Sequence, residues 1–152
     1  MPNYWLIVGT PANFQVSAQL GWTVQGFKSR HGKKAAAMRP GDKLIYYLTQ
    51  QQALAGVATV VSTYFEAHDP VWKSEAKPGE DYPWRVHIAP DVILDPSRSL
   101  PVAPLAGRLV HVRKWPAANW TLAFQGNVHL LPPEDGELLI DLIRRASGAA
   151  PA

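Results

Sequence analysis

A run of five basic residues lies between positions 28 and 39, ahead of Asp42, the first acidic residue of the chain. The run consists of Lys28, Arg30, Lys33, Lys34 and Arg39. Trp22 and Phe27 lie close to it in the sequence. Cations beside aromatic rings are typical of surfaces that bind nucleic acid, because the cations neutralise phosphates and the rings stack on bases. A solvated helix face is the alternative interpretation.

Charge is segregated along the chain, although the net charge is only +3. Residues 1–41 hold five basic and no acidic residues, residues 42–95 hold four and eight, and residues 96–152 hold six and four. A second interval without acidic residues, 96–133, contains Arg98, Arg108, Arg113 and Lys114. If the two acid-free intervals meet in the fold, they form one positive face of the kind that a nucleic-acid backbone requires.

Residues that could perform catalysis do not form a known motif. The five histidines lack the spacing of metal ligands, and cysteine is absent. The histidines are His31, His68, His87, His111 and His129. His68 and Asp69 are neighbours, but such a pair is more often a surface ion pair than a catalytic dyad. No phosphate-binding loop, nucleophile elbow or dinucleotide-binding signature is present. The sequence therefore favours a non-catalytic protein without metal or cofactor, with an enzyme acting on a nucleoside or RNA as an alternative.

Trp72 differs from the other five tryptophans because it lies in a polar, turn-rich segment, residues 68–81. No strand or helix pattern there requires a large apolar side chain. Two interpretations stay open: the ring anchors the segment to the core, or it forms the aromatic wall of a pocket that stacks a base.

Hydrophobic patterning and turn residues predict the elements that position these side chains. Strands are expected at 4–8, 43–49, 53–66, 82–94 and 128–131, and helices at 11–20, 33–38 and 132–145. Thr10 followed by Pro11 predicts the N-cap and first position of the first helix. The order lacks βαβ alternation, so we expect an α+β fold: a mixed β-barrel of about five to six strands flanked by helices.

Length and composition predict one folded domain, residues 1–147, with a disordered tail at 148–152. Apolar residues make up 47% of the 152-residue chain and charged residues 18%, which is ordinary for a globular protein. The apolar run near the N-terminus is too short for a signal peptide or a membrane span. Together with the lack of cysteine, this indicates a cytoplasmic protein that does not associate with membranes, and oligomeric state stays open.

Seven short segments recur in the order found in one family. They are YWLIV at 4–8, QGFK at 25–28, RPGDKLIYYL at 39–48, GVATVVST at 56–63, YPWRVHI at 82–88, WTLAFQG at 120–126 and PPED at 132–135. Spanning nearly the whole chain, this ordered set resembles the EVE family, stand-alone PUA-like domains related to the YTH readers of methylated RNA. The QGFK segment is expected to form a turn.

The resemblance implies a PUA-type barrel whose pocket admits one flipped, modified nucleobase of DNA or RNA. Carried onto matching positions, the pocket residues are Thr10, Asn13, Gln25, Gly26, Phe27, Trp72 and Tyr82. The basic run would hold phosphates beside it. Relatives often have a tryptophan where this chain has Gln25, whose amide donates and accepts, which indicates a modified cytosine rather than methyladenine. A small-ligand or nucleoside-processing protein using the same pocket is the alternative.

Overall fold

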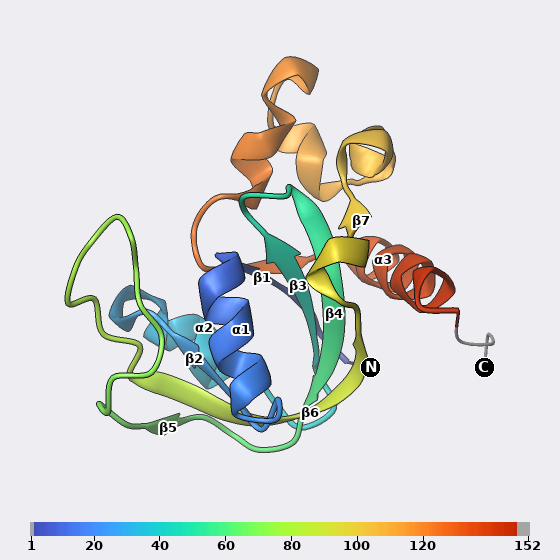
Figure 1. The fold of residues 1–152 in the computed structure, drawn as a ribbon. Coiled ribbons are helices and arrows are strands. Elements are labelled where there is room, and N and C mark those ends of the chain that lie inside the picture. Colours follow the sequence, from blue (N-terminus) through green and yellow to red (C-terminus); the bar gives the residue numbers. More distant parts are fainter. Residues whose placement is uncertain (1, 149–152) are drawn as a thin grey trace.

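The computed structural model describes residues 2–148, which contain eight strands in one curled, mixed sheet (Figure 1). The strands are β1 (Tyr4–Gly9), β2 (Val24–Phe27), β3 (Lys43–Leu48), β4 (Ala53–Val60), β5 (Phe65–Glu66), β6 (Trp84–Ile93), β7 (Leu100–Pro101) and β8 (Val128–Leu131). The main path of the sheet runs β2-β6-β4-β3-β1-β8, while β5 pairs with β6 and β7 with β4. Only β1 and β3 pair in parallel within this described sheet.

Helices flank the sheet on both sides. The α-helices are α1 (Pro11–Gln19), α2 (Gly32–Ala37) and α3 (Pro133–Ala146), and the 3₁₀ helices are η1 (Ser29–His31), η2 (Pro96–Arg98), η3 (Ala103–Arg108), η4 (His111–Lys114) and η5 (Ala117–Phe124). The Thr10 hydroxyl accepts a hydrogen bond from the Asn13 backbone N–H at 3.2 Å, so the predicted N-cap of α1 is confirmed. The α+β prediction is likewise confirmed.

Strands β1 and β3 lie in the middle of the sheet, and both of their faces are covered. Leu6 and Ile45 belong to one core cluster, which includes residues of η3, η4, η5 and α3. Trp5 and Leu44 belong to a second cluster, which includes residues of α1 and α2. Figure 1 shows α1 and α2 on one side of the sheet and α3 on the other. Burial on both faces explains why β1 is a continuous apolar run rather than an alternating one.

Two predicted elements are wrong in detail. The expected turn at residues 25–28 is largely strand β2, which pairs antiparallel with β6, and Gly26 lacks the positive φ that a turn glycine would use. The strand expected at 53–66 stops at Val60 and resumes as β5. Just after β4, the backbone N–H of Val61 still donates to the His87 carbonyl of β6 at 2.9 Å. The chain therefore stays beside β6, with which β5 also pairs.

The predicted tail, residues 148–152, lies outside the described residues except for Gly148, which is in a turn after α3. The predicted domain, residues 1–147, stays a prediction. Within residues 2–148, no helix combines the length and apolar character needed to cross a bilayer.

The buried carboxylate of Asp42 ties the start of β1 to the turn before β3. It accepts hydrogen bonds from the backbone N–H of Asn3 at 3.0 Å and of Arg39 at 3.1 Å. It also accepts one from the indole N–H of Trp5 at 3.0 Å. Hydrogen bonds to an ionised carboxylate are stronger than neutral ones. This carboxylate therefore holds the RPGD turn in place, and with it the parallel pairing of β1 and β3.

Replacing Asp42 by alanine leaves these three donors without their acceptor. We expect Asp42→Ala to lower the free energy of unfolding by roughly 2–4 kcal/mol, measured by urea denaturation. The matched control is Asp141→Ala, because that carboxylate pairs with Arg145 on the exposed surface of α3 at 3.0 Å. The control should cost less than about 0.5 kcal/mol. Equal losses in the two variants would contradict the role given to Asp42.

Candidate functional site

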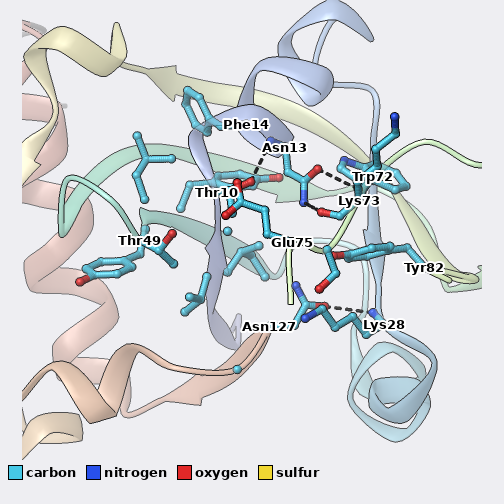
Figure 2. Close-up of a pocket in the computed structure, with 18 of the residues that line it drawn as sticks. Thr10, Asn13, Phe14, Lys28, Thr49, Trp72, Lys73, Glu75, Tyr82 and Asn127 are labelled. Carbon is cyan, nitrogen blue, oxygen red and sulfur yellow. Dashed lines mark hydrogen bonds between the residues drawn. The ribbon is translucent and has the colours of Figure 1, made fainter. Parts of the chain in front are cut away.

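A cavity of about 370 Å³ opens where the parallel strands β1 and β3 end at the same edge of the sheet (Figure 2). Its walls come from the β1–α1 connection, the end of β3, strand β2, the loop of residues 68–81 and residues 124–127. Ligand sites of α/β sheets typically lie at the carboxyl ends of parallel strands. The cavity is thus the natural candidate for a binding site in this fold.

Five of the seven predicted pocket residues line this cavity: Thr10, Asn13, Gln25, Trp72 and Tyr82. Gly26 and Phe27 do not. The Phe27 side chain is fully buried in the core cluster that includes residues of α1 and α2, because β2 directs it there. Sequence reasoning missed several lining residues, among them Tyr47, Thr49, Glu75 and Asn127, and no local pattern marked them. Phe124, also missed, lies in the WTLAFQG segment.

Trp72 anchors its loop and also lines the cavity, so the anchor interpretation holds, while stacking of a base on this ring stays a prediction. Its ring lies so close to Gly26 that a Cβ atom there would be 2.3 Å from Cζ3 of the indole. The indole N–H donates to the Ser17 hydroxyl at 3.0 Å. The guanidinium of Arg85 lies over the ring, 5.2 Å from its centroid. The same guanidinium donates a hydrogen bond to the Asp69 carboxylate at 2.6 Å. The residue as a whole is only 4% exposed.

Asn13 holds the same loop over the cavity. Its amide donates to the Lys73 carbonyl at 2.7 Å and accepts from the Lys73 backbone N–H at 2.9 Å, the pair of dashed lines in Figure 2. The Tyr82 ring lies beside Trp72, with centroids 6.2 Å apart. Burial raises the pKa of Tyr82, although its hydrogen bond with Asn13 acts in the opposite direction. The Asn13 amide is therefore committed to loop placement.

The amide of Gln25 is held in one orientation. Its Oε1 accepts from the Tyr46 hydroxyl at 2.8 Å, and its Nε2 donates to the Gly26 carbonyl at 2.9 Å. The reverse orientation would place two carbonyl oxygens against each other. Burial raises the pKa of Tyr46 far above its ordinary value, so the hydroxyl keeps its proton and donates it. One N–H of Gln25 is left to donate.

Basic residues gather at the mouth of the cavity, where the two acid-free intervals meet. Lys28 and Arg30 line the mouth. The Lys34 ammonium donates to the Val128 carbonyl at 2.8 Å, and the Lys28 backbone N–H donates to the Asn127 side chain at 3.0 Å. Burial, followed by the charge of Arg30, lowers the pKa of Lys28. Of the other predicted phosphate contacts, Lys33 and Arg39 are exposed and do not line the cavity.

Two histidines with lowered pKa values lie in this basic region. Nε2 of His31 accepts from the Arg30 guanidinium at 3.2 Å, which requires an unprotonated nitrogen. Burial, with the charges of Lys34, Arg30 and Lys28, lowers the pKa of His31 from 6.5 to about 4. Burial also lowers the pKa of His129, and Lys34 and Lys114 act in the same direction. The charged side chains that act on these two rings are thus all basic, a setting that favours an incoming anion.

His68 forms surface ion pairs, as the sequence favoured, but its partners are Asp81 and Glu66 rather than Asp69. The His68 ring hydrogen-bonds Asp81 and Glu66, both at 2.6 Å, because β5 and the end of the loop bring these carboxylates beside it. The hydrogen bond to Asp81, and after it the one to Glu66, raises the pKa of His68. Asp69 pairs with Arg85 instead. His68 does not line the cavity, and within residues 2–148 no three His, Asp or Glu side chains converge to hold a metal ion.

The chain matches the model of the EVE domain over residues 3–109. It is similar to a UPF0310 protein of Pyrococcus abyssi, with 28% identity over 149 residues, 93% of this chain and 99% of the relative. A UPF0310 protein of Pyrococcus horikoshii is 25% identical over 150 residues, 92% and 98% of the two chains.

Among solved structures, the complex of the YTH domain-containing protein Mmi1 with RNA has a TM-score of 0.68 at 15% identity, over 95% of this chain and 83% of that one. A protein of Rhodopseudomonas palustris has a TM-score of 0.56 at 20% identity, over 96% and 93%. The predicted PUA-like α+β fold is confirmed, with the sheet curled into a half-barrel.

The contact between Trp72 and Gly26 can be tested by adding one methyl group. We expect Gly26→Ala to displace the indole and release the loop, so that trypsin cleaves after Lys73 at least tenfold faster. Gly107→Ala is the matched control, because a Cβ atom at Gly107 meets nothing within 4 Å. If both variants are cleaved at the wild-type rate, the contact does not hold the loop.

The surroundings of His31 predict a pH dependence. Because its pKa falls from 6.5 to about 4 on folding, the unfolded chain binds a proton between these values that the folded chain does not. The contribution of His31 to stability is therefore complete above pH 6.5 and is lost as the pH falls towards 4. His31→Gln should flatten that part of the curve of unfolding free energy against pH. A His31 ring that titrates near pH 6.5 by NMR would refute the assignment.

Proposed function

The chain belongs to the EVE domain family, and from this premise we propose that it is a non-catalytic nucleic-acid-binding module that receives a flipped, modified base of DNA or RNA. The observation that carries the proposal is one cavity with aromatic and amide walls and a cationic mouth. The likeness to a YTH domain crystallised with RNA supports a nucleic-acid partner.

The size and walls of the cavity suit one base. Its volume of about 370 Å³ is near the lower end of the roughly 300–1,000 Å³ typical of ligand pockets. Extruding a base costs a few kcal/mol, and aromatic stacking returns about 1–3 kcal/mol per base. Tyr82 supplies aromatic surface, and Gln25 supplies a donor for the base edge. Stacking and hydrogen bonding together would offset the cost of extrusion.

Basic side chains would carry the backbone of the strand past the cavity. Lys28 and Arg30 lie at the mouth, and the positive region continues through Lys34 to Lys114, which both act on the His129 ring. The exposed Lys33 and Arg39 would contact phosphates farther along the strand. Such contacts position a nucleic acid without reading its sequence.

The chemistry of the lining supports binding rather than catalysis. Among the described residues that line the cavity there is no histidine and no aspartate, and Glu75 is the one carboxylate. General acid–base catalysis needs a proton donor and acceptor within reach of one bound substrate. The lining offers cations, hydroxyls and amides instead.

A panel of oligonucleotides tests the proposal directly. DNA and RNA strands that carry one 5-methylcytosine, 5-hydroxymethylcytosine or N6-methyladenine are compared with unmodified strands by fluorescence anisotropy. We expect at least one modified strand to bind tenfold or more tightly than its unmodified counterpart. Equal affinity for every strand would refute base recognition, and absence of binding would refute the function itself.

The mouth cations predict how binding depends on salt. Neutralising Lys28 and Arg30 together, as Lys28→Gln with Arg30→Gln, removes two phosphate contacts. The slope of log K against log salt concentration should then become shallower by about 1.4–1.8. Arg144→Gln with Arg145→Gln, in α3 on the other side of the sheet in Figure 1, is the matched control and should leave the slope unchanged. If the wild type and both double variants show the same slope, the nucleic acid does not bind at the mouth of the cavity.

A further inference from the structure

The Arg30 guanidinium at the mouth of the cavity is hydrogen-bonded to a histidine. Its Nε donates to Nε2 of His31 at 3.2 Å. Within residues 2–148, no carboxylate forms an ion pair with Arg30. A guanidinium has five N–H donors and no acceptor, so most of its donors are still available to an anion. Since Arg30 lines the cavity, a phosphate in the mouth would be within its reach.

His31 accepts this hydrogen bond only as a neutral ring, because both nitrogens of a protonated ring are donors. The charged and titratable groups that act on the ring include no acid. They are Arg30 of the same 3₁₀ helix, Lys28 directly after β2, Lys34 of α2 and His129 of β8. A proton on His31 would add one more positive charge to this cluster and would set two donors against each other. The free protein therefore keeps the ring neutral.

A phosphate in the mouth would reverse both effects. An ionised oxygen accepts hydrogen bonds from a guanidinium more strongly than a neutral ring nitrogen does, so the phosphate would replace His31 as the acceptor for Arg30. Nε2 of His31 could then take a proton from solvent and donate it in a hydrogen bond to the same phosphate. The negative charge also stabilises the protonated ring, because an opposite charge within about 4–6 Å favours the charged form.

We propose that His31 is a phosphate-binding residue of the mouth and that its ring takes up one proton from solvent when a strand binds there. This inference rests on the proposed function and adds a dependence on pH to it. Histidine suits the role because its charge changes near neutral pH. Since binding takes up a proton, affinity rises as the pH falls, by at most about tenfold per pH unit for one proton.

Affinity measured at two pH values tests this role. Every strand of the oligonucleotide panel above that binds is titrated by fluorescence anisotropy at pH 7.5 and at pH 5.5, at constant ionic strength. Wild-type affinity should rise about tenfold over this interval. His31→Gln keeps an acceptor for Arg30 but takes up no proton, so its affinity should rise less than about threefold. Circular dichroism at both pH values checks that each protein is folded.

His87→Gln is the matched control, because this exposed histidine of β6 stacks on Phe65 with ring centroids 4.6 Å apart and does not line the cavity. It should keep the wild-type rise. In the wild type, NMR should show that the His31 ring titrates at a higher pH in the complex than in the free protein.

Two results would overturn the role of His31 and leave the proposed function standing. One is wild-type affinity that does not change between the two pH values. The other is a His31→Gln variant that keeps the wild-type rise, or a His31 ring that titrates at the same pH with and without the strand. Wild-type protein that binds no strand of the panel at either pH would overturn both proposals.

Discussion

The contact of the Trp72 ring with Gly26 is the constraint on which the cavity depends. Only glycine lets the indole approach the β2 backbone so closely, since a Cβ atom would lie 2.3 Å from the ring. The hydrogen bond to Ser17 and the Arg85 guanidinium fix the ring in that place. With the ring fixed, the loop carries Lys73 and Glu75 to the end of β1. One aromatic side chain therefore converts the open edge of a sheet into an enclosed site.

The cationic mouth has an electrostatic cost in the free protein. Lys28, Lys34 and His31 all have lowered pKa values because burial and neighbouring cations act together. Among these three groups a carboxylate acts only on Lys28, where Glu80 opposes part of the shift. Here the charges that act on His31 and His129 are all basic, so a phosphate would relieve the repulsion on binding. The cluster of cations therefore favours binding of an anion at the mouth, and it also makes stability depend on pH through His31.

Local signals in the sequence predicted the first strand, the cap at Thr10 and the last helix, since each depends on residues near one another in the chain. Strand β2 was missed because it forms only by pairing with β6, about sixty residues later. The incorrect prediction that Phe27 lines the pocket followed from that error, because the strand directs its side chain into the core. Gln25 was predicted to donate and accept, and its oxygen already accepts one hydrogen bond from the Tyr46 hydroxyl, a contact that no local pattern indicated. Glu75 carried no signal, because a loop residue joins the lining of the cavity only when the loop is placed.

The central claim is that a single base enters this cavity while its backbone crosses the basic mouth. A crystal structure of the protein with a short DNA strand carrying one 5-methylcytosine tests it most directly. We expect electron density for that base beside Tyr82 and Gln25, with its flanking phosphates next to Lys28 and Arg30. A strand bound on another face, with all of its bases outside the cavity, would contradict the account.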